Sequence, residues 1–159
     1  MKKTTLIKKI VARLKENLAV LDKAAQSSRA EATHESSKAE SKYDTRGLEA
    51  GYLASGQARQ AREILESIKI YETLQPRDFA AGEATDLTAL VELEMDGTRS
   101  FFFIGQKNGG LEIEHAGQEI TVITPQSPLG EQLMGKNAGQ HWTNKLGGST
   151  VKYQLLSVS

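Results

Sequence analysis

Few residues of this chain have both the type and the spacing that catalysis or metal binding requires. His34 lies three positions after Glu31 and one before Glu35, so an imidazole and a carboxylate on one helical turn could hold a metal ion. The same spacing also fits a solvated helix face on which acidic and basic side chains pair with one another. We favour the charged helix face, because two or three loosely placed ligands do not make a site.

The other candidates for chemistry lie near turns. Lys107-Asn108-Gly109-Gly110 lacks the Gly-x-x-x-x-Gly-Lys-Ser/Thr order of a phosphate-binding loop and does not open a helix, so we interpret it as a hairpin loop. His115 and His141 have no cysteine beside them and no His-x-x-x-His spacing, so turn or edge positions suit them better than a zinc site. These residues predict no free-standing active site.

Composition limits the kinds of partner. The chain has 159 residues, no cysteine, and 20 basic against 20 acidic residues. Residues 1–75 carry 14 Lys and Arg against 10 Asp and Glu, whereas residues 76–159 carry 6 against 10. Neither half has the dense basic face of a nucleic-acid binder, so a protein partner suits them better. Disulfides are excluded and no run of about 18 apolar residues exists to span a bilayer, so we expect a cytoplasmic protein with no membrane partner.

Residues 1–75 have the pattern of two helices. Apolar or small residues recur at alternating steps of four and three, from Ile7 to Ala32 and again from Ala50 to Tyr71. Between these stripes, polar residues 41–47 provide a turn in which Asp44 can cap the second helix. We predict an antiparallel α-helical coiled-coil hairpin with its tip at about residues 41–49. A coiled coil that only dimerises or spaces other parts has the same periodicity, and the pattern leaves that alternative open.

After Pro76, which ends the helical pattern because it lacks an amide donor, the period becomes two. Strand patterns occur at 87–95, 99–104, 111–114 and 119–124, near 141–142, and at 150–158. Asp96-Gly97 has the chemistry of a hairpin turn. Ser127 and Pro128 begin a short helix as its cap and its first residue. The predicted fold class is therefore α+β, with the helical hairpin over 1–75 and a small β-rich domain over 76–159.

The second half also carries an ordered set of motifs. They are Ile123-Thr124-Pro125-Gln126-Ser127-Pro128-Leu129-Gly130, Leu133-Met134-Gly135-Lys136, Gly147-Gly148, Tyr153 and Val158. This order resembles the C-terminal domain of the Gre transcript-cleavage factors, in which a strand, a Ser-Pro helix start, a Gly-Lys helix end, a strand, a Gly-Gly turn and a closing strand follow one another. The resemblance covers essentially the whole chain, because Gre factors also have an N-terminal helical hairpin of this length, and it implies an FKBP-like shape for the second half.

The resemblance implies both a partner and a mode of action. In Gre factors the C-terminal domain docks at the rim of the secondary channel of RNA polymerase while the hairpin enters the channel. The partner would then be RNA polymerase, and nascent RNA and DNA would be reached only through the elongation complex. The chain would have no enzyme activity and no cofactor of its own. The partner-binding residues would be Ser127, Pro128, Leu129, Gly130, Gly135 and Lys136.

Residues 43–54 resemble, more loosely, the acidic tip of the Gre hairpin. The resemblance implies two catalytic carboxylates, Asp44 and Glu49, which would help hold a second Mg²⁺ in the polymerase active site while backtracked RNA is cleaved. Gre factors place these acids within a short Asp-x-x-Glu, whereas Asp44 and Glu49 lie five positions apart. Cleavage stimulation and a different effect, such as inhibition or competition, both stay open. A coiled-coil adaptor with no role in RNA cleavage is the alternative from another class.

Overall fold

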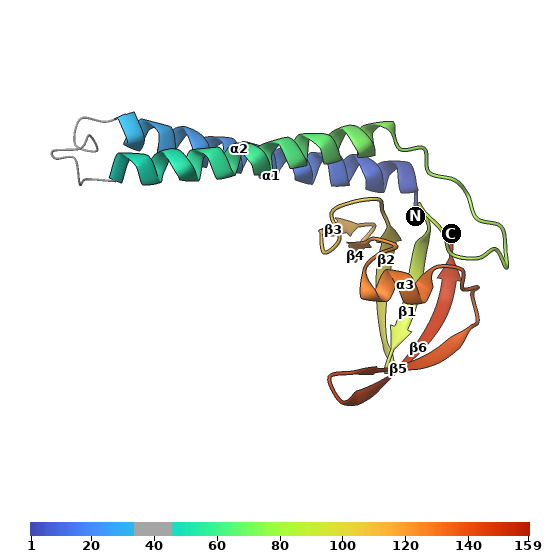
Figure 1. Ribbon diagram of the computed structural model, residues 1–159. Coiled ribbons are helices and arrows are strands. Elements are labelled where there is room, and N and C mark those ends of the chain that lie inside the picture. The colour runs from blue at the N-terminus through green and yellow to red at the C-terminus, as the bar shows by residue number, and fades with distance from the viewer. Residues whose placement is uncertain (34–45) are drawn as a thin grey trace. The chain divides into compact units, whose positions relative to one another are not determined.

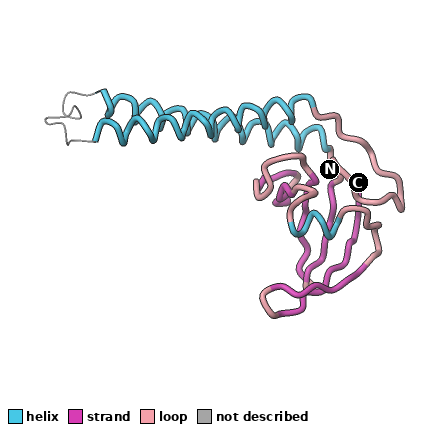
Figure 2. Tube along the Cα trace, viewed as in Figure 1, coloured by secondary structure: helices cyan, strands magenta, loops and turns pink. Residues whose placement is uncertain are grey.

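The computed structural model describes residues 1–33 and 46–159, which form an α+β fold (Figures 1 and 2). Two N-terminal helices precede a six-stranded sheet with one short helix. By their contacts, Met1–Ile10 and Thr73–Ser159 form one compact unit, and Val11–Glu72 forms a second. The sequence predicted a boundary after residue 75. In the structure the first ten residues group with the second half instead. No helix in the described ranges is long and apolar enough to cross a membrane.

The helices α1 (Lys3–Thr33) and α2 (Arg46–Thr73) lie side by side and run in opposite directions in the unit Val11–Glu72 (Figure 1). Lys15 Nζ and Glu72 Oε1 join them at 2.8 Å. Wherever side chains are described, both predicted stripes are the buried or half-buried side of their helix, with Leu14 and Ile68 among the buried residues. The second helix begins at Arg46, so the end of the predicted tip, 46–49, is already helical backbone.

The sheet has the strand order β3-β4-β2-β1-β6-β5. Its strands are β1 (Leu90–Met95), β2 (Thr98–Ile104), β3 (Glu112–His115), β4 (Gln118–Ile123), β5 (His141–Leu146) and β6 (Ser149–Val158). Only the pairing of β2 with β4 is parallel among these described strands. At the predicted turns Asp96-Gly97 and Gly147-Gly148 both central residues have positive φ, which matches the twist of the flanking strands.

The first predicted strand is shorter in the structure than its alternating pattern. The strand β1 begins at Leu90, and Leu87 precedes it in a turn. The reason is Thr88, whose φ of 68° is left-handed and whose N–H donates to the Ile104 carbonyl at 2.9 Å. A residue in that conformation cannot continue a strand, so the apolar alternation overstated its length.

Both faces of the sheet are buried over β1, β2 and β4. One face contains a core cluster with Val91, Leu93, Phe102 and Leu155, against which the short helix α3 (Pro128–Leu133) packs through Leu133. On the other face the fully or almost fully buried residues are Leu90, Phe103, Ile113, Ile120 and Val122. Leu6 and Ile10 are also fully buried, and Lys9 Nζ donates to the Glu114 carbonyl at 2.9 Å. Burial of these residues explains why Met1–Ile10 belongs to this unit.

Candidate partner-binding surface around α3

The start of α3 is closed by hydrogen bonds of Ser127. Its Oγ accepts the N–H of Gly130 at 3.1 Å and donates to the Thr124 carbonyl at 2.7 Å. Pro128 follows at the first helical position, where a missing N–H leaves no donor unpaired. The predicted cap is confirmed, and the bend from β4 into α3 has a single compact form.

Gly130 is required at its position by space. A Cβ on this residue would lie 1.8 Å from the Thr124 carbonyl oxygen and 2.8 Å from Ser127 Oγ. Real Cβ atoms do not approach other atoms so closely. The turn can therefore close over the helix only because residue 130 has no side chain.

The end of α3 is held by Thr85, which lies in the long connection before β1. Gly135 has a φ of +78°, and its N–H donates to the Thr85 carbonyl at 2.9 Å. In return the Lys136 carbonyl accepts both the N–H of Thr85, at 2.8 Å, and its Oγ1, at 2.9 Å. Thr85 is almost fully buried. The Gly-Lys pair is thus fixed to the body of the domain by three hydrogen bonds.

The Lys136 ammonium lies over an aromatic ring. Its Nζ is 4.6 Å from the centroid of the Trp142 ring, and Trp142 stacks on Tyr153 at 5.3 Å with an interplanar angle of 7°. The indole Nε1 donates to Gln132 Oε1 at 2.9 Å, so the same ring also contacts α3. Sequence reasoning missed Trp142 and Gln132. The available signal was the single tryptophan of the chain, placed in a polar edge strand that offers little other apolar surface.

The predicted partner-binding residues divide into two groups. Leu129 is half-buried and packs against the core cluster, and Gly130 is buried, so these two shape the surface from within. The residues accessible to a partner are the exposed Pro128 and Gly135 and the half-buried Ser127 and Lys136. The structure brings all six together around one short helix.

Next to this helix lies a charged cluster that sequence reasoning did not identify. The Arg77 guanidinium pairs with Glu83 and stacks on Phe79 at 4.0 Å, and Lys3 Nζ lies over the same ring at 4.7 Å. The pKa of Glu83 is lowered, first because its carboxylate accepts the Ala80 N–H and then because of Arg77. Burial lowers the pKa of Lys3. A hollow of about 350 Å³ joins this cluster to Gly135.

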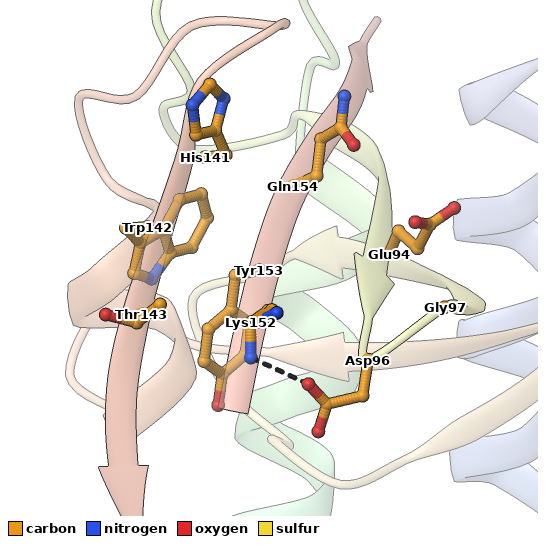
Figure 3. A pocket seen from close by; sticks show the side chains of 9 residues that line it. All are labelled: Glu94, Asp96, Gly97, His141, Trp142, Thr143, Lys152, Tyr153 and Gln154. Atoms are coloured by element: carbon orange, nitrogen blue, oxygen red, sulfur yellow. Dashed lines mark hydrogen bonds between the residues drawn. The ribbon is translucent and has the colours of Figure 1, made fainter. Parts of the chain in front are cut away.

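A second hollow, of about 450 Å³, opens over the end of β1, the start of β5 and the middle of β6 (Figure 3). Its acidic groups are already engaged, because Asp96 Oδ1 accepts the Lys152 N–H at 2.8 Å and Glu94 pairs with Arg99 at 3.6 Å. Its other polar side chains include His141 and Gln154. The stacked rings of Trp142 and Tyr153 line the same hollow.

The predicted tip carboxylates are not placed by the structure. Asp44 and His34 lie outside the described residues, and Glu49 falls on α2 where only the backbone is described. Among the described residues, no group of three or more His, Cys, Asp or Glu could hold a metal ion. His141 is exposed on the edge strand β5 and His115 is buried at the end of β3.

No protein-family model matches the chain, and no curated protein matches it either. Among solved structures, it is similar to GreA factor homolog 1 (Gfh1) of Thermus thermophilus, with 20% identity over 98% of this chain and 94% of that one and a TM-score of 0.36. Gfh1 of Thermus aquaticus is 22% identical over 92% of each chain, with a TM-score of 0.38. The elongation factor GreA/GreB from Nitrosomonas europaea is 15% identical over 62% of this chain and 78% of that one, with a TM-score of 0.37. With TM-scores below 0.5 these likenesses do not decide function, which we base on the residues of this chain.

Proposed function

We propose that this chain is a Gre-like transcription factor that binds RNA polymerase at the secondary channel and modulates elongation. The observation that supports this most directly is the surface around α3. Three of the motif residues that resemble Gre have a defined structural role there, namely Ser127 as the cap, Gly130 through the space that it leaves and Gly135 through its positive φ. The strands and the Gly147-Gly148 turn follow in the order that the resemblance requires.

The two parts of the chain would have separate tasks. The surface around α3 would provide affinity for the polymerase, and the far end of the paired helices would provide the effect. Such a factor needs no active site of its own, since the chemistry of RNA cleavage belongs to the polymerase.

The effect on transcription would depend on Asp44 and Glu49. Two carboxylates at one tip could help hold a Mg²⁺ that stabilises the attacking and leaving oxygens of a phosphodiester. Glu49 lies in the first turn of α2, and Asp44 precedes that helix by two residues. If the carboxylates reach the same ion, the factor stimulates cleavage. If they do not, occupation of the channel inhibits the polymerase or excludes other channel-binding factors.

The deciding experiment uses purified, backtracked elongation complexes with and without this protein, alongside a direct polymerase-binding assay. Shortened RNA together with binding would establish a transcript-cleavage factor. Binding without cleavage would establish a channel-occupying regulator. Absence of binding would refute the proposed function.

A coiled-coil adaptor is the second candidate, and one observation favours it. Val20 on α1 and Leu65 on α2 are large apolar residues that are 71% and 52% exposed. Such side chains could contact another helix. Sedimentation equilibrium separates the candidates, because an adaptor that dimerises would gain mass with concentration, whereas a polymerase-binding monomer would not.

A further inference from the structure

Lys136 has contacts both at its backbone and at the end of its side chain. Its backbone carbonyl is held by the N–H and Oγ1 of Thr85, and its ammonium lies 4.6 Å from the centroid of the Trp142 ring. A lysine on a surface normally loses considerable rotamer freedom when a partner binds it. The contact of the Lys136 ammonium with the Trp142 ring would reduce this loss.

Trp142 is itself held in place from two sides. Its ring stacks on the almost fully buried Tyr153, and its Nε1 donates to Gln132 of α3. Gln132 Nε2 in turn donates to the Pro128 carbonyl at 3.3 Å. The indole therefore connects the edge strand β5 to α3 through Gln132. Its position determines where the ammonium is presented.

The segment of chain that follows α3 is basic, and the two acids that line the hollow with Trp142 are already engaged, Glu94 with Arg99 and Asp96 with the Lys152 N–H. From Lys136 to the last residue there are three lysines and no Asp or Glu, whereas residues 76–135 contain all ten acids of the second half. Three lysines over 24 residues are too sparse for a phosphate backbone, which needs a dense basic face. They suit a protein surface with a few carboxylates.

We propose that Trp142 is a positioning residue that holds Lys136 as a preorganised cationic anchor, and that this anchor recognises an acidic side chain on a protein partner. The Trp142 ring attracts the ammonium through its π face and does not pair with it as a carboxylate would. N–H donors of Lys136 therefore remain available for a carboxylate of the partner. Gln132 and Trp142 form the wall beside it. The inference rests on the proposed function only for the identity of the partner, RNA polymerase.

The test measures the anchor without polymerase. A fluorescein-labelled oligoglutamate peptide is titrated with the full chain at low ionic strength and followed by anisotropy, with labelled oligolysine as the charge control. The emission of Trp142, the single tryptophan, is recorded with unlabelled peptide. We expect oligoglutamate, but not oligolysine, to bind and to change the Trp142 emission.

Substitutions of single lysines show which of them binds the oligoglutamate peptide. Lys136→Gln should weaken oligoglutamate binding about 3- to 10-fold, as for loss of one preorganised ion pair. Lys136→Arg should stay within about 2-fold of the wild type, because guanidinium also stacks on indole. Lys145→Gln is the matched control. Lys145 is an exposed lysine on β5, the strand that carries Trp142, and its substitution should have the smaller effect.

Coupling tests the role of Trp142. Trp142→Leu should weaken binding about 2- to 5-fold, and Trp142→Phe, which keeps a ring, should weaken it less. In the double variant Lys136→Gln/Trp142→Leu the losses should not add, because Trp142 acts through Lys136. Circular dichroism of each variant identifies any that fails to fold, and Trp142→Phe then replaces Trp142→Leu in the cycle.

Three results would overturn the inference. They are a wild-type chain that does not bind oligoglutamate, a Lys136→Gln variant no weaker than Lys145→Gln, and additive losses in the double variant. Competition between oligoglutamate and RNA polymerase then addresses the partner. If the chain binds the peptide through Lys136 but does not bind polymerase, the inference about the anchor stands and the proposed function is refuted.

Discussion

Gly130 lies so close to Thr124 that a Cβ on the glycine would stand 1.8 Å from the threonine carbonyl oxygen. The same carbonyl accepts the hydroxyl of Ser127, so the contact cannot be relieved without opening the helix cap. Thr124 directly follows β4, and Gly130 lies within α3. The motif residues around α3 are therefore linked by geometry as well as by their order in the chain.

We expect Gly130→Ala to destabilise the unit that contains the sheet by about 2–4 kcal/mol, because the bend from β4 into α3 must shift to admit a methyl group. Urea unfolding followed by Trp142 emission measures this change. The control is Gly56→Ala in α2, where a Cβ meets nothing within 4 Å; because Gly56 lies in the unit Val11–Glu72, its unfolding is followed by far-UV circular dichroism. That substitution should be neutral or stabilise by up to about 1 kcal/mol. Equal effects of the two would contradict the steric account.

Ser127→Ala should lower the free energy of unfolding by about 1 kcal/mol, since it removes the side-chain acceptor of the Gly130 N–H. Ser127→Thr keeps the hydroxyl and should recover most of the loss. Because Ser127 and Pro128 are also predicted to contact the polymerase, the alanine variant should bind it more weakly. A variant with unchanged stability would show that the cap hydrogen bonds contribute little to the fold.

The stability of the protein should depend on the protonation of His115. This residue is 6% exposed, and neither ring nitrogen has a hydrogen-bond partner among the described residues. Its pKa is lowered from the usual 6.5, mainly by burial and further by Lys9 and the N-terminus. The unfolded chain therefore takes up a proton at a higher pH than the folded chain does. Stability from this group is present above the unfolded pKa and is lost as the pH falls below about 6.5.

Urea unfolding at several values between pH 5 and 8 checks this expectation. In His115→Leu the decline of stability below the usual histidine pKa should be smaller than in the wild type. The control is His141→Gln, which replaces the exposed histidine of β5. An identical pH dependence in wild type and His115→Leu would show that His115 does not contribute.

If the proposed factor stimulates cleavage, Asp44→Asn and Glu49→Gln should each abolish the release of short RNA from backtracked complexes. Both substitutions remove a charge at nearly constant shape, so affinity for the polymerase should stay within about 2-fold. Glu63→Gln, which removes an exposed carboxylate further along α2, is the control and should leave cleavage intact. Cleavage by both tip variants would refute the assignment of these carboxylates.

The local features of this protein could be predicted from the sequence, because each depends on neighbouring residues. Turn chemistry at Asp96-Gly97 and the cap formed by Ser127 and Pro128 are contained in a few consecutive positions, and both occur as predicted. The change from the helical period to the period of two after Pro76 likewise separated the helices from the strands. The carboxylates Asp44 and Glu49 stay a prediction, since the structure does not describe their side chains.

Only the tertiary structure decided which segments lie together. Parallel pairing of β2 with β4 joins strands that are separated by β3, and no local pattern specifies that choice. Leu6 and Ile10 lie outside the apolar stripe that begins at Ile7, so the sequence predicted neither their burial nor the grouping of Met1–Ile10 with Thr73–Ser159. Trp142 reaches Lys136 and Gln132 because β5 lies at the sheet edge beside β6. Such contacts depend on how a long chain closes on itself, whereas turns and caps depend on the residues next to them.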